Sequence, residues 1–249
     1  IVDRVQSYQP SQIVYIVDRR QFLHFEQVFR AARKGGIANE DVALVHAGFG
    51  TMNGPDGKPF KTREGGVMRL EDLIADAVEK ARARLKEAGL EDEEGIAHQV
   101  AIAAIKFADL QNNRASDYVF DLERMTRFEG KTGPYLLYQA VRIQSLLAKA
   151  EDDFGAAVLK IQNEDINLAL SLCEYPDHFA NALAGYAPHI LCEYVYDLAQ
   201  TFSTFYGAVH ILSEEDEVLR ASRLRLCAMT HARIVEVLGL LGIQVPERM

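Results

Sequence analysis

The sequence has no tryptophan and only three cysteines among 249 residues. Cys173, Cys192 and Cys227 are odd in number and lack the close spacing of a metal site, so they indicate free, buried thiols in a reducing compartment. No apolar run approaches the roughly 20 residues of a membrane span. No basic start followed by a short apolar core marks a secretion signal. The sequence therefore predicts a cytoplasmic protein with no membrane partner and no protein-bound metal.

Basic charge is also scarce, because 27 Lys and Arg stand against 36 Asp and Glu, for a net charge of −9. Such a balance alone argues against a nucleic-acid partner. The charge is uneven, however. Residues 1–90 hold 14 basic and 12 acidic side chains, a net +2, and residues 91–249 hold 13 and 24, a net −11. A local basic patch can therefore still bind RNA on an acidic chain.

Two kinds of pattern are present along the chain. β-Branched and aromatic residues at 12–17 predict a buried strand, 22–36 predict a helix ending at a Gly pair, and 41–45 predict a second strand. Strand, helix and strand in this order predict a parallel βαβ unit, with a loop at 46–66 after it. Beyond residue 68, apolar residues recur at helical spacing. We expect these helices at 69–89, 96–110, 134–152, 163–174, 176–186, 188–206 and 214–241.

The fold class predicted is mixed: the remnant of a parallel α/β (Rossmann-type) domain, followed by an all-α helical bundle. Two strands cannot make an ordinary parallel sheet. Because residue 1 is Ile and not Met, we expect the other strands to lie upstream of this chain. In the bundle, Ser213 with Asp216 predicts a capping box.

The stretch 54–66, GPDGKPFKTREGG, combines glycines with Lys58, Lys61 and Arg63. One interpretation is a solvated surface turn, because Pro-Asp-Gly is a strong turn signal. The other is anion binding, since Lys and Arg neutralise phosphate and the stretch follows a parallel strand, where α/β ligands bind. It is not a Walker loop, because no GKS or GKT follows the glycines. Both interpretations stay open on spacing alone.

Longer sequence segments help to decide between the surface turn and the anion-binding site. Four segments occur in a fixed order, and the chain ends in LGIQVPERM. They are IVYIVDRRQFLHFEQVFRAARKGG at 13–36, HAGFGTMNGPDGKPFKTREGG at 46–66, ASDYVFDLERMTRFEGKTGPYLLYQAVRIQSLL at 115–147 and PHILCEYVYDLAQTFSTFYGAVHIL at 188–212. Together they strongly resemble the arginyl-tRNA synthetase family. The resemblance covers nearly the whole chain and is weakest at 151–187.

The resemblance implies an arginine–tRNA ligase that uses ATP with Mg²⁺ and binds L-arginine and tRNA(Arg), monomeric in the intact enzyme. The stretch 54–66 is then the counterpart of the class I KMSKS signature in a degenerate form, Pro59-Phe60-Lys61-Thr62-Arg63. Mobile cations there would stabilise the departing pyrophosphate. The roles of individual cations stay open among the implied catalytic residues, which are Lys58, Lys61, Thr62 and Arg63.

The resemblance also assigns binding residues upstream of the loop. Gln21 corresponds to a glutamine that lines the arginine pocket, where a neutral amide suits a guanidinium. The alternative is a helix-start residue that bonds the backbone. His24 is at most a contact, and ordinary packing is its alternative. The segment against the adenosine is implied to contain His46, Phe49, Gly50 and Met52.

For the bundle, the resemblance implies a DALR-type anticodon-binding domain. The implied domains are a catalytic part at 1–68, a connecting helical part at 69–130 and the anticodon-binding bundle at 131–249. Helical spacing predicts that Tyr194, Leu198, Phe202 and Phe205 are core. Other aromatics and cations either bind RNA or serve as bundle core and ordinary ion pairs. The implied tRNA-binding residues are Arg114, Arg124, Arg142, Tyr206 and Met249.

The family's HIGH-type signature and its arginine-binding Tyr and Asp have no counterpart in residues 1–20. We therefore expect the carboxyl-terminal half of a synthetase, inactive on its own. The alternatives are a stand-alone tRNA-binding module without catalytic activity and a helical interaction protein.

Overall fold

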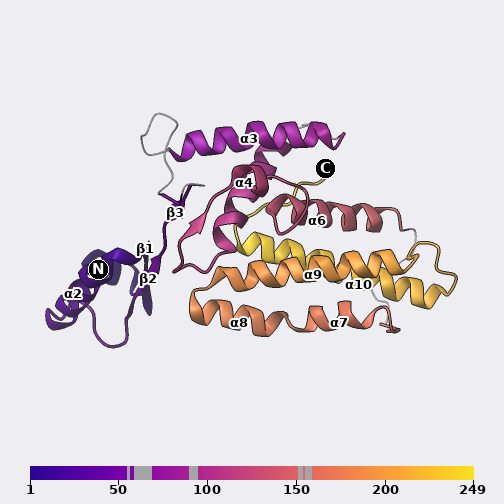
Figure 1. The fold of residues 1–249 in the computed structure, drawn as a ribbon. Helices are drawn as coiled ribbons and strands as arrows, with labels where there is room; N and C mark the ends of the chain where they lie inside the picture. Colours follow the sequence, from indigo (N-terminus) through magenta and orange to yellow (C-terminus); the bar gives the residue numbers. More distant parts are fainter. Residues whose placement is uncertain (55–56, 59–68, 90–94, 151–153, 155–158) are drawn as a thin grey trace. The chain divides into compact units, whose positions relative to one another are not determined.

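The computed structural model describes residues 1–54, 57–58, 69–89, 95–150, 154 and 159–249 (Figure 1). The chain forms two compact units. Unit 1 consists of Ile1–Phe60 and Asn113–Phe120, and unit 2 of Lys61–Asn112 and Asp121–Met249. The chain therefore returns to unit 1 once, after it has built two helices of unit 2.

Unit 1 is an α/β unit whose centre is a pair of parallel strands. Its elements are α1 (Val2–Tyr8), β1 (Gln12–Asp18), the 3₁₀ turn η1 (Arg19–Gln21), α2 (Phe22–Lys34), β2 (Ala43–Phe49), β3 (Met52–Asn53) and β4 (Tyr118–Val119). β1 and β2 are parallel, in a register that runs from Gln12 opposite Ala43 to Asp18 opposite Phe49. β3 and β4 form a second parallel pair. The predicted parallel βαβ unit is confirmed.

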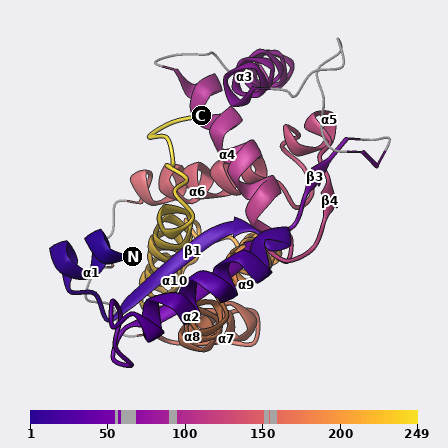
Figure 2. The ribbon, with the colours of Figure 1, turned by 90° about the vertical axis from the view of Figure 1, so that its left-hand side faces the viewer.

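Helix α2 runs along the sheet (Figure 2) and packs on it through aromatic rings. Tyr15 of β1 lies 5.0 Å from Phe25 and 5.6 Å from Phe29, centroid to centroid. The helix ends at Gly35, whose N–H donates to the Ala31 carbonyl at 2.8 Å. Gly36 then takes a positive φ of 66°, a conformation in which glycine carries no side-chain penalty. The predicted Gly stop is therefore confirmed.

Two predictions for unit 1 were wrong in detail. The second strand occupies 43–49 and not 41–45, because pairing with β1 extends it through four residues that were predicted as loop. Residues 18–21, between the predicted strand and helix, suggested a loop from the sequence, but Arg19–Gln21 form a 3₁₀ turn. The Asp18 carboxylate accepts from the N–H of Arg20 at 2.8 Å and so caps this turn.

The described part of unit 2 contains helices and no strand, as predicted. Its helices are α3 (Leu70–Glu87), α4 (Ile96–Leu110), α5 (Leu122–Met125), α6 (Gly133–Ala148), α7 (Ile166–Cys173), α8 (Tyr175–Gly185), α9 (Pro188–Ala208) and α10 (Glu217–Leu240). Within this unit, α7 and α8 lie on one side of α9, and α3 and α4 lie on the far side of α6 (Figure 1). No described helix is long and apolar enough to cross a membrane.

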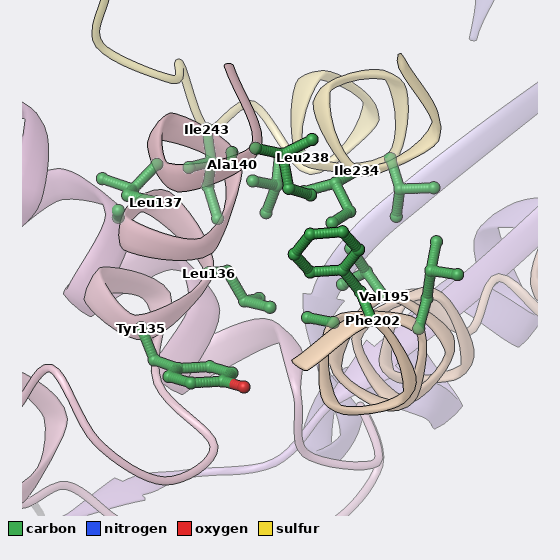
Figure 3. Packing of buried hydrophobic residues seen from close by; sticks show 14 of the residues in the cluster. Tyr135, Leu136, Leu137, Ala140, Val195, Phe202, Ile234, Leu238 and Ile243 are labelled. Carbon is green, nitrogen blue, oxygen red and sulfur yellow. The ribbon is translucent and has the colours of Figure 1, made fainter. Parts of the chain in front are cut away.

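The core of unit 2 lies between α6, α9 and α10. Leu136 of α6 points toward side chains of α9 and α10, whereas Leu137 lies on the opposite side of this helix (Figure 3). On α9, the four predicted core residues Tyr194, Leu198, Phe202 and Phe205 are all buried, which confirms the helical stripe. These side chains pack α6, α9 and α10 against one another.

The helix starts follow local side-chain chemistry. Thr132 caps α6 by accepting from the N–H of Tyr135 at 3.2 Å, and Pro134 stands in the first turn as predicted. The predicted capping box with Ser213 is wrong. Asp216 is itself the N-cap of α10 and accepts from two backbone N–H groups, those of Val218 at 3.0 Å and Leu219 at 3.1 Å.

The cysteines differ from one another. Cys192 and Cys227 are buried in the core of unit 2, and burial raises the pKa of each thiol to about 12. Cys173 is exposed at the end of α7, so its predicted burial was wrong. The helical period leaves this position on the outside of a short helix.

Candidate functional site

The candidate site of unit 1 is the edge of the sheet where β1 and β2 end side by side, at Asp18 and Phe49. The carboxyl edge of a parallel sheet is where α/β proteins bind ligands. Asp18 faces Arg20, and the hydrogen bond from the Arg20 side chain is the main reason why the pKa of Asp18 falls to about 2. The turn after β1 therefore carries a fixed, ionised carboxylate.

Gln21 follows directly at the end of this turn. It is the N-cap residue of α2, is exposed, and makes no side-chain capping hydrogen bond. The Gln21 side chain therefore does not bond the backbone at the helix start, which was the alternative considered from the sequence. His24, one turn later, is also exposed and lies edge-on to Phe25, with 5.4 Å between the ring centroids.

His46 stands within β2 and packs on α2. Its ring is stacked on Phe25, with centroids 5.1 Å apart and planes 6° apart, and it lies 6.0 Å from the ring of Phe22. Its Nε2 is buried without a hydrogen-bond partner among the described residues. Phe49, the last residue of β2, is exposed. His46 therefore lies on the face of the sheet that packs against α2, whereas Phe49 lies at the carboxyl edge of the sheet.

Gly50 makes the closest approach in unit 1. Its N–H donates to the Arg114 carbonyl at 2.9 Å, and a Cβ at this position would lie 2.2 Å from the Ser116 carbonyl oxygen. Glycine is therefore required at residue 50 for contact with the chain's own segment 113–118. Met52 continues this contact in β3, which pairs with Tyr118.

Asp117 is a site-edge residue that the sequence patterns did not reveal. One carboxylate oxygen accepts from the Thr51 N–H at 2.7 Å, and the other pairs with the Arg19 guanidinium at 2.9 Å. The same guanidinium donates to the Ala115 carbonyl at 2.8 Å. Arg114, implied as a tRNA contact, donates to the Gly48 carbonyl. The returning segment therefore fixes the chain that leads into the basic stretch.

Part of that basic stretch is described. Gly57 has a φ of 71°, and the N–H of Gly54 donates to the Lys58 carbonyl at 2.7 Å, so these residues form a tight turn. Lys58 is exposed there. The other implied catalytic residues, Lys61, Thr62 and Arg63, lie outside the described residues.

In unit 2, the structure brings together two implied tRNA-binding residues. The guanidinium carbon of Arg142 on α6 lies 4.2 Å from the ring centroid of Tyr206 on α9. Both side chains are half-buried. A second cation, Lys131, lies 5.8 Å above the ring of Tyr196. These cations lie on aromatic faces, whereas ordinary ion pairs with nearby carboxylates were the alternative considered from the sequence.

The remaining implied RNA contacts are separate from this pair. Arg124 is exposed on α5, where its backbone N–H donates to the Asp121 carboxylate at 3.2 Å. Met249 is half-buried and packs against the core of unit 2. Within the described residues, no group of three His, Cys, Asp or Glu side chains is arranged to hold a metal ion.

Comparison with known proteins finds two family matches along the chain. Residues 1–122 match the family model of class I tRNA synthetases (R), catalytic domain, and residues 136–249 match the DALR anticodon binding domain. The chain is 50% identical to the arginine–tRNA ligase of Maricaulis maris and 51% identical to that of Hyphomonas neptunium, over its full length. The chain belongs to the arginyl-tRNA synthetase family. It spans 44% of the length of each of these two relatives.

A solved structure agrees with this assignment. The arginyl-tRNA synthetase of Plasmodium falciparum superposes on this chain with a TM-score of 0.83 at 28% identity, over 100% of this chain and 43% of that one. The fold of this chain explains where its match to the catalytic-domain family ends. The match stops at residue 122, directly after the segment 113–120 has completed unit 1.

Proposed function

We propose that this chain supplies the adenylate-forming loop and the anticodon-binding bundle of an arginine–tRNA ligase. Such an enzyme joins L-arginine to tRNA(Arg) through an arginyl-adenylate, with ATP and Mg²⁺ as substrate. The observation that carries the proposal is the succession of a class I catalytic match and a DALR match within one chain. We further propose the functional division 1–68, 69–130 and 131–249, and a monomeric, cytoplasmic intact enzyme.

The ATP side of the proposal rests on the carboxyl edge of the sheet. His46 lies in the middle of β2 and Phe49 ends this strand. Gly50 and Met52 follow directly after it. In our proposal this segment lies along the adenosine. Lys58, Lys61, Thr62 and Arg63 follow in sequence and provide hydroxyl and cationic groups to the leaving pyrophosphate. Mg²⁺ would be held mainly by the phosphates, since it keeps most of its own water and needs few protein ligands.

The arginine side rests on Gln21. An amide oxygen accepts from a guanidinium without adding charge, and the Gln21 side chain is exposed and makes no capping bond to α2. Gln21 ends the 3₁₀ turn that follows Asp18, the last residue of β1. We propose that it contacts the substrate guanidinium.

The tRNA side rests on cations and aromatics of both units. Arg142 with Tyr206 offers a charged aromatic surface, and the exposed Arg124 offers a phosphate contact. Met249 packs at the end of the chain against the bundle core. Arg114 would contact RNA only with groups not engaged by the Gly48 carbonyl.

A chimeric ligase tests the proposal directly. The matching part of the Maricaulis maris enzyme is replaced by this chain, and arginylation of tRNA(Arg) is measured with ATP. We expect activity, and a loss of about 100-fold in kcat for Lys61→Ala or Arg63→Ala. Lys34→Ala on the last turn of α2 is the control and should stay active. A folded chimera that binds tRNA(Arg) but forms no arginyl-tRNA would contradict the proposal.

The chain on its own has a separate expectation. Because the sequence contains no HIGH-type signature, we expect no arginylation from the pure chain. Activity that scales with the concentration of the chain would show that this part of the proposal is wrong. Binding of tRNA without activity in the chimera would favour the stand-alone binding module.

A further inference from the structure

The chain passes from one strand pair of unit 1 to the other at Gly50 and Thr51, and one carboxylate meets it there. We propose that Asp117 is a positioning residue for ATP: through the Thr51 N–H it holds the segment after β2 in the conformation that binds the adenosine. This inference rests on the proposed function, because it names what orients the ATP side of the same site. Asp117 is not a catalytic residue in this proposal, since it acts on ATP only through Thr51.

The first support is where the two strand pairings end and begin. β2 pairs with β1 up to its last residue, and β3 pairs with β4 (Figure 2). The N–H groups of Gly50 and Thr51 lie between these two pairings and need other acceptors. The Gly50 N–H donates to the Arg114 carbonyl at 2.9 Å, and the Thr51 N–H donates to the Asp117 carboxylate at 2.7 Å. Asp117 therefore fixes the backbone at the point where the chain changes its strand partner.

The second support is how the carboxylate itself is held. Its other oxygen pairs with the Arg19 guanidinium at 2.9 Å, and this guanidinium also donates to the Ala115 carbonyl at 2.8 Å. The two side chains of the pair are 51% and 41% exposed, so the ion pair alone contributes little to stability. Arg19 therefore orients the carboxylate, and the charge-assisted bond from the Thr51 N–H holds the segment.

The third support is the sequence of the held segment. Gly48 and Gly50 flank Phe49, whose side chain is exposed at the carboxyl edge of the sheet. Glycine gives the backbone wide conformational freedom, so these neighbours do not by themselves direct the Phe49 ring. A Cβ at Gly50 would lie 2.2 Å from the Ser116 carbonyl oxygen, which shows how closely the two segments approach. Contacts from the segment 113–118 therefore direct Phe49, which we propose to lie beside the adenosine.

The chimeric ligase described above measures the effect on ATP. Asp117→Ala should raise the KM for ATP about tenfold, because the hydrogen bond from Thr51 to a charged acceptor is lost. The kcat and the KM for tRNA(Arg) should change by less than about twofold, because the loss concerns ATP binding alone. Asp41→Ala, which removes an exposed carboxylate just before β2, is the matched control and should leave all three values unchanged. Thermal unfolding confirms that each variant is folded.

Asp117→Asn tests the mechanism. Its amide oxygen can still accept from the Thr51 N–H, so its KM for ATP should lie closer to that of the unsubstituted chimera than the KM of Asp117→Ala does. A role in stability alone would lower kcat through loss of folded enzyme and leave the KM for ATP unchanged, and that result would overturn the inference. An equal KM for ATP in the Asn and Ala variants would also overturn it. If the unsubstituted chimera is folded but forms no arginyl-tRNA, the proposed function itself is wrong, and this inference fails with it.

Discussion

Asp117 and Arg19 form an ion pair of 2.9 Å although 98 residues separate them in the sequence. The other oxygen of Asp117 accepts from the Thr51 N–H. One carboxylate therefore joins the end of β1 to the residue that precedes β3. The segment that returns from the helices of unit 2 thus holds the start of the chain that leads into the basic stretch.

Removing this carboxylate should loosen that chain. We expect Asp117→Ala to speed hydrogen exchange at the Thr51 amide about tenfold or more, because a hydrogen bond to a charged acceptor contributes about 1.5–3 kcal/mol. Exchange measured by NMR or mass spectrometry gives the result. Glu40→Ala, an exposed acidic residue of unit 1, is the control. Unchanged protection of Thr51 would show that Asp117 does not hold this segment.

Gly133 and Gly239 should respond in opposite directions to the same substitution. A Cβ at Gly133 would lie 2.2 Å from the Ala103 carbonyl oxygen, whereas a Cβ at Gly239 would meet nothing within 4 Å. Gly133→Ala should therefore cost about 1–3 kcal/mol of the free energy of unfolding. Gly239→Ala should add about 0.5–1 kcal/mol, since alanine has the better helix propensity. Urea unfolding measures both, and equal effects would contradict the close packing of α6 on α4.

Replacing Arg223 alone should lower the free energy of unfolding strongly, whereas replacing it together with its partner Asp165 should lower it little. Its side chain is only 6% exposed, and its Nε lies 3.1 Å from a carboxylate oxygen of Asp165, which is fully buried. Arg223→Leu leaves that charge unpaired and should cost about 3–5 kcal/mol. The double variant Arg223→Leu with Asp165→Leu should recover most of the loss. A double variant as unstable as the single one would show that the pair itself contributes the stability.

His231 should make the stability of unit 2 depend on pH. Burial lowers the pKa of His231 below its ordinary value of 6.5, and its Nε2 has no hydrogen-bond partner among the described residues. The unfolded chain therefore takes up the proton first. The contribution of His231 is fully present above pH 6.5 and is lost as the pH falls through its lower, folded-state pKa.

Urea unfolding at about pH 7.5 and about pH 5.5 tests this dependence. His231→Gln should lose less stability between the two conditions than the unsubstituted chain. His98→Gln, at an exposed position of α4, is the reference for the effect of the substitution itself. If both variants lose the same stability as the unsubstituted chain, His231 does not contribute to the dependence.

Local patterns were sufficient for most elements. The apolar period predicted the long helices of unit 2, and Gly35 with Gly36 predicted the end of α2. Pairing between distant segments was not predictable in this way. His46 to Phe49 are strand because they lie opposite β1, and nothing in their own composition indicates a strand. A cap was placed at the wrong residue because Ser213 and Asp216 both suit one.

The same limit applies to the site. The basic stretch was recognised from its own glycines and cations, whereas its catalytic role and the role of Gln21 were implied by family resemblance. Asp117 was missed because its partners, Arg19 and Thr51, are 98 and 66 residues away. Arg142 and Tyr206 were each named from the sequence, but their contact depends on how α6 packs against α9.

Binding of this chain to RNA shows whether its helical bundle reads an anticodon. The chain is titrated with a tRNA(Arg) transcript and with one in which the central anticodon base is changed, at about 50 mM and about 200 mM salt. We predict tighter binding of the unchanged transcript at both salt concentrations, by about 1–3 kcal/mol, the size of effect typical of one specifically recognised position. Equal binding of the two transcripts would contradict an anticodon-reading bundle in this chain.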